Sequence, residues 1–145
     1  MAHALLEEGT LTAEESLALR TLAGWGGDLA QIREALRHSL HTVKAVCDGR
    51  TVGMGRLVGD GVMHWYVQDV IVHPEAQGQG IGKAVMEALL AHIAAHSMPG
   101  TRVTVGLFSA QGREGFYEQL GFRVRPNARE GAGMHRNLII PERAD

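Results

Sequence analysis

The sequence predicts an α/β fold with a mixed, mostly antiparallel central sheet that is flanked by helices. Two amphipathic helical patterns come first, and strand patterns separated by short turns follow them. A helical pattern that begins at residue 81 then connects the strand over residues 62–72 to one over residues 102–108, as in a crossover between parallel strands. The length of 145 residues predicts a single domain, residues 1–145, that can bury a core.

The two N-terminal helices are predicted from their caps and their apolar spacing. Thr12 places a hydroxyl before an acidic first turn, and the glycines of residues 24–27 end the first helix. Asp28 has the position of a cap for the second helix. The apolar residues that follow at helical spacing are Leu29, Ile32, Ala35, Leu36 and Leu40.

The strands are predicted from β-branched residues and from turns. Asp48-Gly49 is a hairpin signal between strands over residues 43–47 and 51–58. A long strand over residues 62–72 follows the next turn. A helix that begins at Ile81 fades at residues 97–100. After it we expect, in order, a strand over 102–108, a short helix over 111–119, and strands over 122–124 and 134–140.

Composition excludes several classes of function. The net charge of −2 and the dispersed basic residues predict no nucleic-acid partner. No apolar run has the length of a membrane span, so no membrane association is expected. The single cysteine, Cys47, excludes a disulfide framework, and the N-terminus lacks the basic-then-apolar pattern of a signal peptide. These features predict a reducing, cytoplasmic location.

The most informative segment is a glycine loop between a strand and a helix. The β-branched run of residues 70–72 meets His73-Pro74, and Gly78, Gly80 and Gly82 precede the helical pattern. Such a loop can turn several backbone N–H groups toward one anion at the positive end of a helix dipole, and the expected anion is a phosphate. The spacing is one residue short for a Walker A loop, and Ala84 stands where that loop needs a hydroxyl. The G-x-G-x-G spacing also departs from the dinucleotide fingerprint.

The segment resembles the coenzyme loop of the GNAT-type N-acetyltransferase superfamily. That loop reads Gln/Arg-x-x-Gly-x-Gly/Ala, and residues 77–82 match it at every position. Residues 116–122, Phe-Tyr-Glu-Gln-Leu-Gly-Phe, resemble a second family motif about 35–40 residues further on. The resemblance implies that the parallel strand pair splays apart. It also implies acetyl-CoA as cosubstrate and an acetyl transfer to a primary amine, by direct attack on the thioester.

The resemblance implies a set of coenzyme-binding residues. Backbone groups of the long strand pair with the pantetheine arm, a backbone N–H near Val70 polarises the thioester carbonyl, and loop amides bind the diphosphate. Lys83 either adds charge there or is a solvated helix residue. The expected coenzyme-binding residues are Val70, Ile71, Val72, Gln77, Gly78, Gln79, Gly80, Ile81, Gly82 and Lys83.

The expected catalytic residues are Tyr117 and Asp69. An alkylamine has a pKa of about 10.4, so the site needs a proton acceptor, and the leaving thiolate needs an acid such as a phenol. Tyr117 matches the family's tyrosine in that role, and its alternative is a core aromatic beside Phe116 and Phe122. Asp69 is the ionisable candidate for the base, with capping or pairing within the sheet as its rival role. Strict alternation turns it away from the face of Gln68 unless a β-bulge intervenes.

The substrate side is predicted on the same long strand. Gln68 occupies a place where the family often has a carboxylate or histidine, so a simple one-residue base is in doubt. His64 and Tyr66 share its face by alternation and could relay a proton through water. Together with Trp65 and Trp25 they indicate an aromatic or flat amine, and Trp65 has a core position as its alternative. The expected acceptor is a small molecule, with a protein amine as the second option and a non-catalytic acyl-CoA sensor as the alternative class.

No metal site is predicted. His92 and His96 stand four residues apart on a helix but lack a third partner in the local sequence. The resemblance also makes a homodimer a possible assembly, through exposed strands at the C-terminal end.

Overall fold

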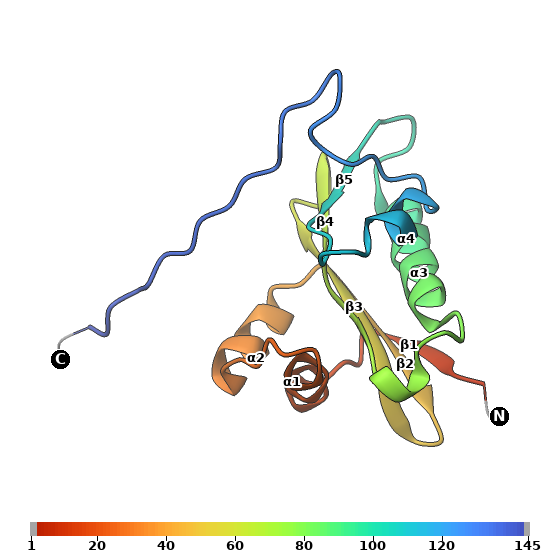
Figure 1. Cartoon of the computed structure of the whole chain (residues 1–145), viewed down its shortest axis with the longest axis vertical. Helices are drawn as coiled ribbons and strands as arrows, with labels where there is room; N and C mark the ends of the chain where they lie inside the picture. The colour runs from red at the N-terminus through yellow and green to blue at the C-terminus, as the bar shows by residue number, and fades with distance from the viewer. Residues whose placement is uncertain (1–2, 144–145) are drawn as a thin grey trace. The chain divides into compact units, whose positions relative to one another are not determined.

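The structure, a computed structural model of the chain, describes residues 3–143. The chain forms two compact units, and the boundary between them in the sequence falls between Leu107 and Phe108. No helix in the described chain is long and apolar enough to cross a membrane. The elements of the first unit, in order, are β1 (Leu5–Glu8), α1 (Ala13–Leu22), α2 (Leu29–Arg37), β2 (His41–Cys47), β3 (Arg50–Gly59), β4 (His64–Val72), a 3-10 turn (Pro74–Ala76), α3 (Ile81–His96) and β5 (Thr104–Leu107) (Figure 1).

The first unit contains a five-stranded sheet with the order β1-β2-β3-β4-β5. Neighbouring strands are antiparallel except β4 and β5, which pair in parallel from His64–Thr104 to Val67–Leu107. The predicted fold class is therefore confirmed. The prediction missed β1, whose Leu5-Leu6-Glu7-Glu8 sequence has no alternation of apolar and polar residues. This strand forms because β2 offers an edge to pair with, which no local pattern reveals.

Helices cover both faces of the sheet. α3 packs on β2, β3 and β4, and α1 packs on β3 and β4 from the opposite face (Figure 1). The core on the α1 side contains Leu19, Met54 and Ile71, with Leu11 packed against them. On the other side α3 buries its apolar stripe, Ile81, Val85, Met86, Leu89 and Ile93. The helix predicted to begin at Ile81 and to fade at residues 97–100 is confirmed, since α3 ends at His96.

The predicted caps of α1 and α2 are also confirmed. The Thr12 hydroxyl accepts from the Glu15 amide, and the Glu15 carboxylate accepts from the Thr12 amide, which is a complete capping box. Glu15 also pairs with Lys44 at 3.0 Å and accepts from the Thr51 hydroxyl. Burial raises the pKa of Glu15, but these hydrogen bonds outweigh it and lower the pKa to about 2. The side chain that caps α1 thus also ties the helix to β2 and β3.

Glycines in β3 let α3 approach the sheet closely. A Cβ atom on Gly55 would lie 2.9 Å from Leu89 Cδ1 and 3.0 Å from Val85 Cγ1. Both neighbours are fully buried, so neither has free space to move into.

We expect Gly55→Ala to lower the free energy of unfolding by about 1–3 kcal/mol, because the added methyl overpacks the interface between β3 and α3. Chemical denaturation measures this change. Gly131→Ala is the matched control, because Gly131 lies outside any helix or strand and a Cβ there meets nothing within 4 Å. Equal stability of the Gly55 variant and the wild type would show that α3 can shift away from the sheet at little cost.

The second unit, described from Phe108 to Arg143, contains the short helix α4 (Glu114–Glu118). Its described residues form no strand, so the strands expected over residues 122–124 and 134–140 are wrong. Apolar alternation gives a segment one face to bury, but a strand forms only when another backbone accepts and donates its hydrogen bonds. No such partner is aligned with either segment among the described residues of this unit.

Candidate functional site

A β-bulge interrupts β4 at the centre of the predicted site. Arg56 lies opposite Gln68 and Met54 lies opposite Ile71, so β4 has one residue more than β3 in this interval. Asp69 has a φ of 55°, in the left-handed region that an aspartate tolerates better than most residues. The parallel ladder with β5 ends at Val67, whereas β4 continues to Val72. The backbone of Val70, Ile71 and Val72 therefore follows the bulge and runs beyond the paired part of β5.

The bulge puts the Asp69 side chain between two arginines. Its Oδ1 accepts from Arg20 Nη1 on α1, and its Oδ2 accepts from Arg56 Nε on β3, both at 2.8 Å. Because Arg56 and Gln68 are register partners, Asp69 lies on their face of the sheet, as the bulge alternative requires. The rival structural role expected for Asp69, pairing within the sheet, is thus observed. Its role as proton acceptor stays a prediction.

The two arginines extend this ion pair into a network on the α1 side. Arg20 Nε donates to the Gly26 carbonyl at 2.8 Å, and its guanidinium lies 5.7 Å from the centre of the Trp25 ring. Arg56 Nη1 donates to the Ser39 hydroxyl at 3.3 Å. The loop between α1 and α2, the end of α2 and the β4 bulge are therefore held together by one carboxylate. Sequence reasoning missed Arg20 and Arg56, because each is separated in the chain from the aspartate that it binds.

The glycine loop has the conformation that an anion site needs. Gly78 and Gly80 have φ values of 79° and 80°, which disfavour any residue with a side chain. Gly80 is the N-cap of α3 and provides no side-chain cap, while Gly82 lies within the first turn. The Gln77 side chain donates to the Val72 carbonyl at 3.2 Å and so fastens the loop to the end of β4. The first amides of α3 are thus presented beside the predicted pantetheine strand.

Lys83 extends from the exposed first turn of α3. Its Nζ lies 3.8 Å from Glu87 Oε1, and its side chain is 67% exposed. Both readings of Lys83 remain compatible with this position, since an exposed ammonium one turn from the amides can also approach a phosphate.

The predicted substrate residues lie along β4. His64 is exposed at its beginning, where the Asp60 carboxylate accepts from the amides of residues 62–64. The Tyr66 ring is half-buried, and burial raises the pKa of its phenol. Tyr66 pairs in register with Val58 and Gln68 with Arg56, so both side chains share the α1 side of the sheet with Asp69. The structure therefore brings Tyr66, Gln68 and Asp69 together on one face.

Tyr117 belongs to the second unit and is described within it. It lies on α4, where its ring contacts Phe116 at 4.9 Å and Phe122 at 6.0 Å between ring centres, both edge-on. Burial raises the pKa of its phenol above the usual value near 10, and the nearby Arg113 opposes this in part. The hydroxyl is therefore protonated throughout the neutral range, as an acid for a thiolate must be.

Comparisons with known proteins agree with this geometry. Residues 38–124 match the acetyltransferase (GNAT) domain family. A chloroplastic serotonin N-acetyltransferase 2 from rice is 36% identical over 111 residues, which are 74% of this chain and 54% of the rice protein. A soybean histone acetyltransferase is 28% identical over 141 residues, which are 89% of this chain and 59% of that protein. The chain thus spans little more than half the length of these plant relatives.

Among solved structures, a probable acetyltransferase of unknown function from meticillin-resistant Staphylococcus aureus has a TM-score of 0.81 at 28% identity. The match covers 93% of this chain and 99% of the bacterial one.

Proposed function

Because the chain belongs to the GNAT acetyltransferase family, we propose that it transfers an acetyl group from acetyl-CoA to a primary amine of a small molecule. The observation that supports this most directly is the loop of residues 77–83. Two left-handed glycines lead into a helix whose first amides have no side-chain cap. Those amides suit the coenzyme diphosphate, because they combine free N–H donors with the positive end of a 16-residue helix.

The pantetheine arm is proposed to follow β4 from the bulge to the loop. Its amides would pair with the backbone of Val70, Ile71 and Val72, which lies beyond the end of the β4–β5 ladder. This places the thioester near Val70, whose backbone N–H is the proposed donor to the carbonyl oxygen. Attack by the neutral amine forms a tetrahedral intermediate, and its collapse expels the CoA thiolate. Tyr117 is the proposed acid that protonates this thiolate.

The route by which the amine loses its proton differs from the simplest expectation. Both carboxylate oxygens of Asp69 accept from guanidinium groups, and this supports a positioning role that shapes the bulge. We propose a water chain along Tyr66 and Gln68, on the same face, as the alternative route. The proposed acetyl transfer, as assigned to these residues, needs no metal ion.

The relatives suggest two acceptor classes. The rice relative is named for serotonin and the soybean relative for histones. The half-buried Tyr66 and the exposed Trp25 are aromatic surfaces on the α1 side of the sheet, and these favour a flat small amine. A cytoplasmic or otherwise reducing location and a homodimer stay predictions. The homodimer was predicted from exposed strands at the C-terminal end, and the described residues of the second unit form no such strands.

Gly80→Ala tests the coenzyme site. An alanine costs about 1–2 kcal/mol when it holds a φ of 80°. If the loop must keep this conformation to hold acetyl-CoA, the cost falls on the bound state, and binding becomes roughly tenfold weaker. Isothermal titration calorimetry with acetyl-CoA measures the change. Gly100→Ala is the matched control, because Gly100 has a φ of 79° and also has open space around its Cβ position. Equal weakening in both variants would locate the effect in general stability and not in the loop.

Turnover is tested by thiol release from acetyl-CoA with a panel of aryl and alkyl amines and a histone tail peptide. We expect the aryl-ethylamines to give the highest kcat/KM. Thiol release with the histone tail peptide but with none of the small amines would favour a protein acceptor. Tight binding of acetyl-CoA without thiol release on any amine would favour the acyl-CoA sensor.

A further inference from the structure

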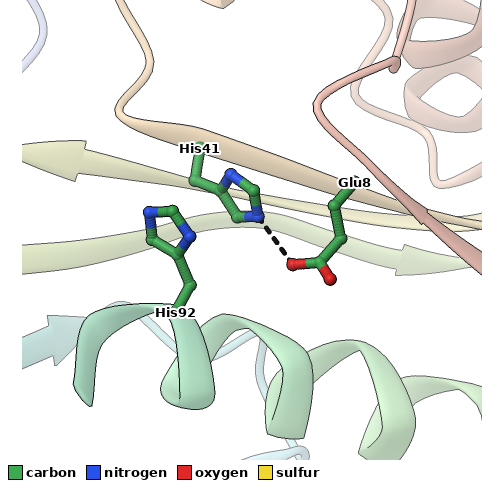
Figure 2. A group of neighbouring side chains, drawn as sticks. All are labelled: Glu8, His41 and His92. Atoms are coloured by element: carbon green, nitrogen blue, oxygen red, sulfur yellow. Dashed lines mark hydrogen bonds and ion pairs between the residues drawn. The ribbon is translucent and has the colours of Figure 1, made fainter. Parts of the chain in front are cut away.

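A cluster of one carboxylate and two imidazoles lies on the α3 side of the sheet. Glu8 ends β1, His41 begins β2, and His92 lies on α3 (Figure 2). His41 Nε2 lies 2.8 Å from Glu8 Oε1, and one donor atom from each of the three residues lies within 4.8 Å of the other two. The rings of His41 and His92 stack with 3.6 Å between their centres. Three metal-binding groups therefore converge from three separate elements.

The proposed acetyl transfer uses none of these residues. The acceptor residues lie on the α1 side of the sheet, and this cluster lies on the other side. His92 is eleven residues beyond Ile81, which places it about 16 Å along α3 from the glycine loop.

We propose that Glu8, His41 and His92 bind a single zinc-like divalent metal ion, with water as the remaining ligand. Two imidazoles and one carboxylate are a recurring zinc ligand set, and imidazole nitrogen prefers zinc-like ions to magnesium or calcium. The sequence spacing had provided only the helical pair His92 and His96. The fold adds the missing partners by pairing β1 with β2 and packing α3 on β2.

The distances are close to those that such a site needs. Ligand bonds of about 2.0–2.1 Å in tetrahedral geometry place donor atoms about 3.3 Å apart. The pair of Glu8 and His41 has to open by about half an ångström from its 2.8 Å hydrogen bond. The donors within 4.8 Å have to close by at most about 1.5 Å, which side-chain rotation can provide.

One feature of the present arrangement must change on binding. The two ring planes are only 8° apart, and a metal ion has to lie close to the plane of each imidazole that binds it. His92 must therefore turn out of the stack. The Glu8 carboxylate is 51% exposed, so the site is open to solvent and to ions. Burial and the neighbouring His41 and His96 lower the pKa of His92, and Glu8 opposes this in part.

His96 has a different place in the cluster. Its ring stacks on His92 with 3.8 Å between centres, and its Nδ1 lies 2.9 Å from the His92 carbonyl oxygen. We therefore assign it a supporting role beside the three ligands. A bound ion would connect β1, β2 and α3, and it would stabilise the first unit by binding the folded state alone.

The test uses the untagged chain of residues 1–145, stripped with a chelator and titrated with Zn²⁺. We expect one ion per chain by calorimetry. A free Zn²⁺ concentration of 100 Kd should raise Tm by about 5–10 °C, and the same concentration of Mg²⁺ should not. Cobalt in place of zinc should give the visible absorption of a tetrahedral site. These readouts do not involve acetyl-CoA, so they remain informative even if the proposed acetyltransferase activity fails.

Variants identify the ligands. Zinc binding should weaken at least tenfold in each of the variants Glu8→Gln, His41→Asn and His92→Asn. Glu8 is exposed, so Glu8→Gln still tests the site if the changes at the half-buried histidines unfold the chain. His38→Asn is the matched control, since His38 pairs with Glu34 at 3.0 Å on α2, an exposed pair outside the cluster. The proposal would be overturned if the Glu8 and His41 variants bound zinc with full affinity and His96→Asn lost it. That result would assign zinc binding to the helical pair His92 and His96 alone. No Tm shift in the wild type would show that the cluster is a metal-free imidazole stack.

Discussion

Tyr117→Phe is expected to lower kcat for acetyl transfer by about 100-fold or more, with little change in the Kd for acetyl-CoA. General acids contribute about 10²–10⁴-fold, and the variant removes the only proton that the ring can donate. The phenylalanine ring keeps the contacts with Phe116 and Phe122, so the fold of this unit should persist. Thiol release with the best amine of the panel measures kcat, and calorimetry measures Kd.

The pH dependence gives a second readout of the same residue. Burial raises the pKa of the Tyr117 phenol above 10, so the acid form is present at every lower pH. Loss of this acid should therefore reduce kcat only above about pH 10, and the rise of kcat at lower pH should reflect the amine or its base. A decline already between pH 7 and 9 would identify a different acid.

A matched change separates the hydroxyl from the ring. Phe122→Leu removes one of the two aromatic contacts and keeps the phenol. It should lower stability and keep kcat within a few-fold of the wild type. If Tyr117→Phe turns over at the wild-type rate, the tyrosine is a core aromatic, which was its rival interpretation.

Asp69→Asn is expected to lower the free energy of unfolding by about 3 kcal/mol. The change removes a carboxylate that is 10% exposed and leaves the guanidinium groups of Arg20 and Arg56 facing each other without an anion. Asparagine tolerates the left-handed backbone at this position, so the loss reports the ion pairs and not the φ of 55°. Urea denaturation measures it.

The control for this variant is Glu34→Gln. Glu34 also pairs with two groups, Arg37 and His38, but its side chain is 56% exposed. Its change should cost less than about 0.5 kcal/mol, because water already solvates these charges.

Kinetics of the Asp69 variant distinguish its two roles. A positioning residue predicts a higher KM for acetyl-CoA, because a relaxed bulge displaces the backbone of residues 70–72. A proton acceptor predicts a collapse of kcat with unchanged stability and KM. The second pattern would refute the structural assignment made from the two ion pairs.

Local chemistry allowed much of this protein to be predicted from its sequence. Thr12 and Asp28 cap the helices after them, because a short oxygen-bearing side chain reaches amides only two or three residues away. Gly78 and Gly80 take left-handed backbone for a reason internal to glycine. The glycine loop and both helix caps depend on interactions over a few residues, and such interactions are visible in the sequence itself.

The rest depended on contacts between distant segments. The bulge that turns Asp69 toward Arg56 is a mismatch of register between two strands, and its partner Arg20 lies 49 residues away. β1 forms because β2 accepts it, and the C-terminal segments that resemble strands find no partner among the described residues of their own unit. Likewise, His92 meets His41 and Glu8 only after the sheet and α3 have packed. The sequence determined the helices, the main strands and the glycine loop because these obey local rules. Tertiary structure alone decided register, ion pairs and the histidine cluster, because these depend on which surfaces come together.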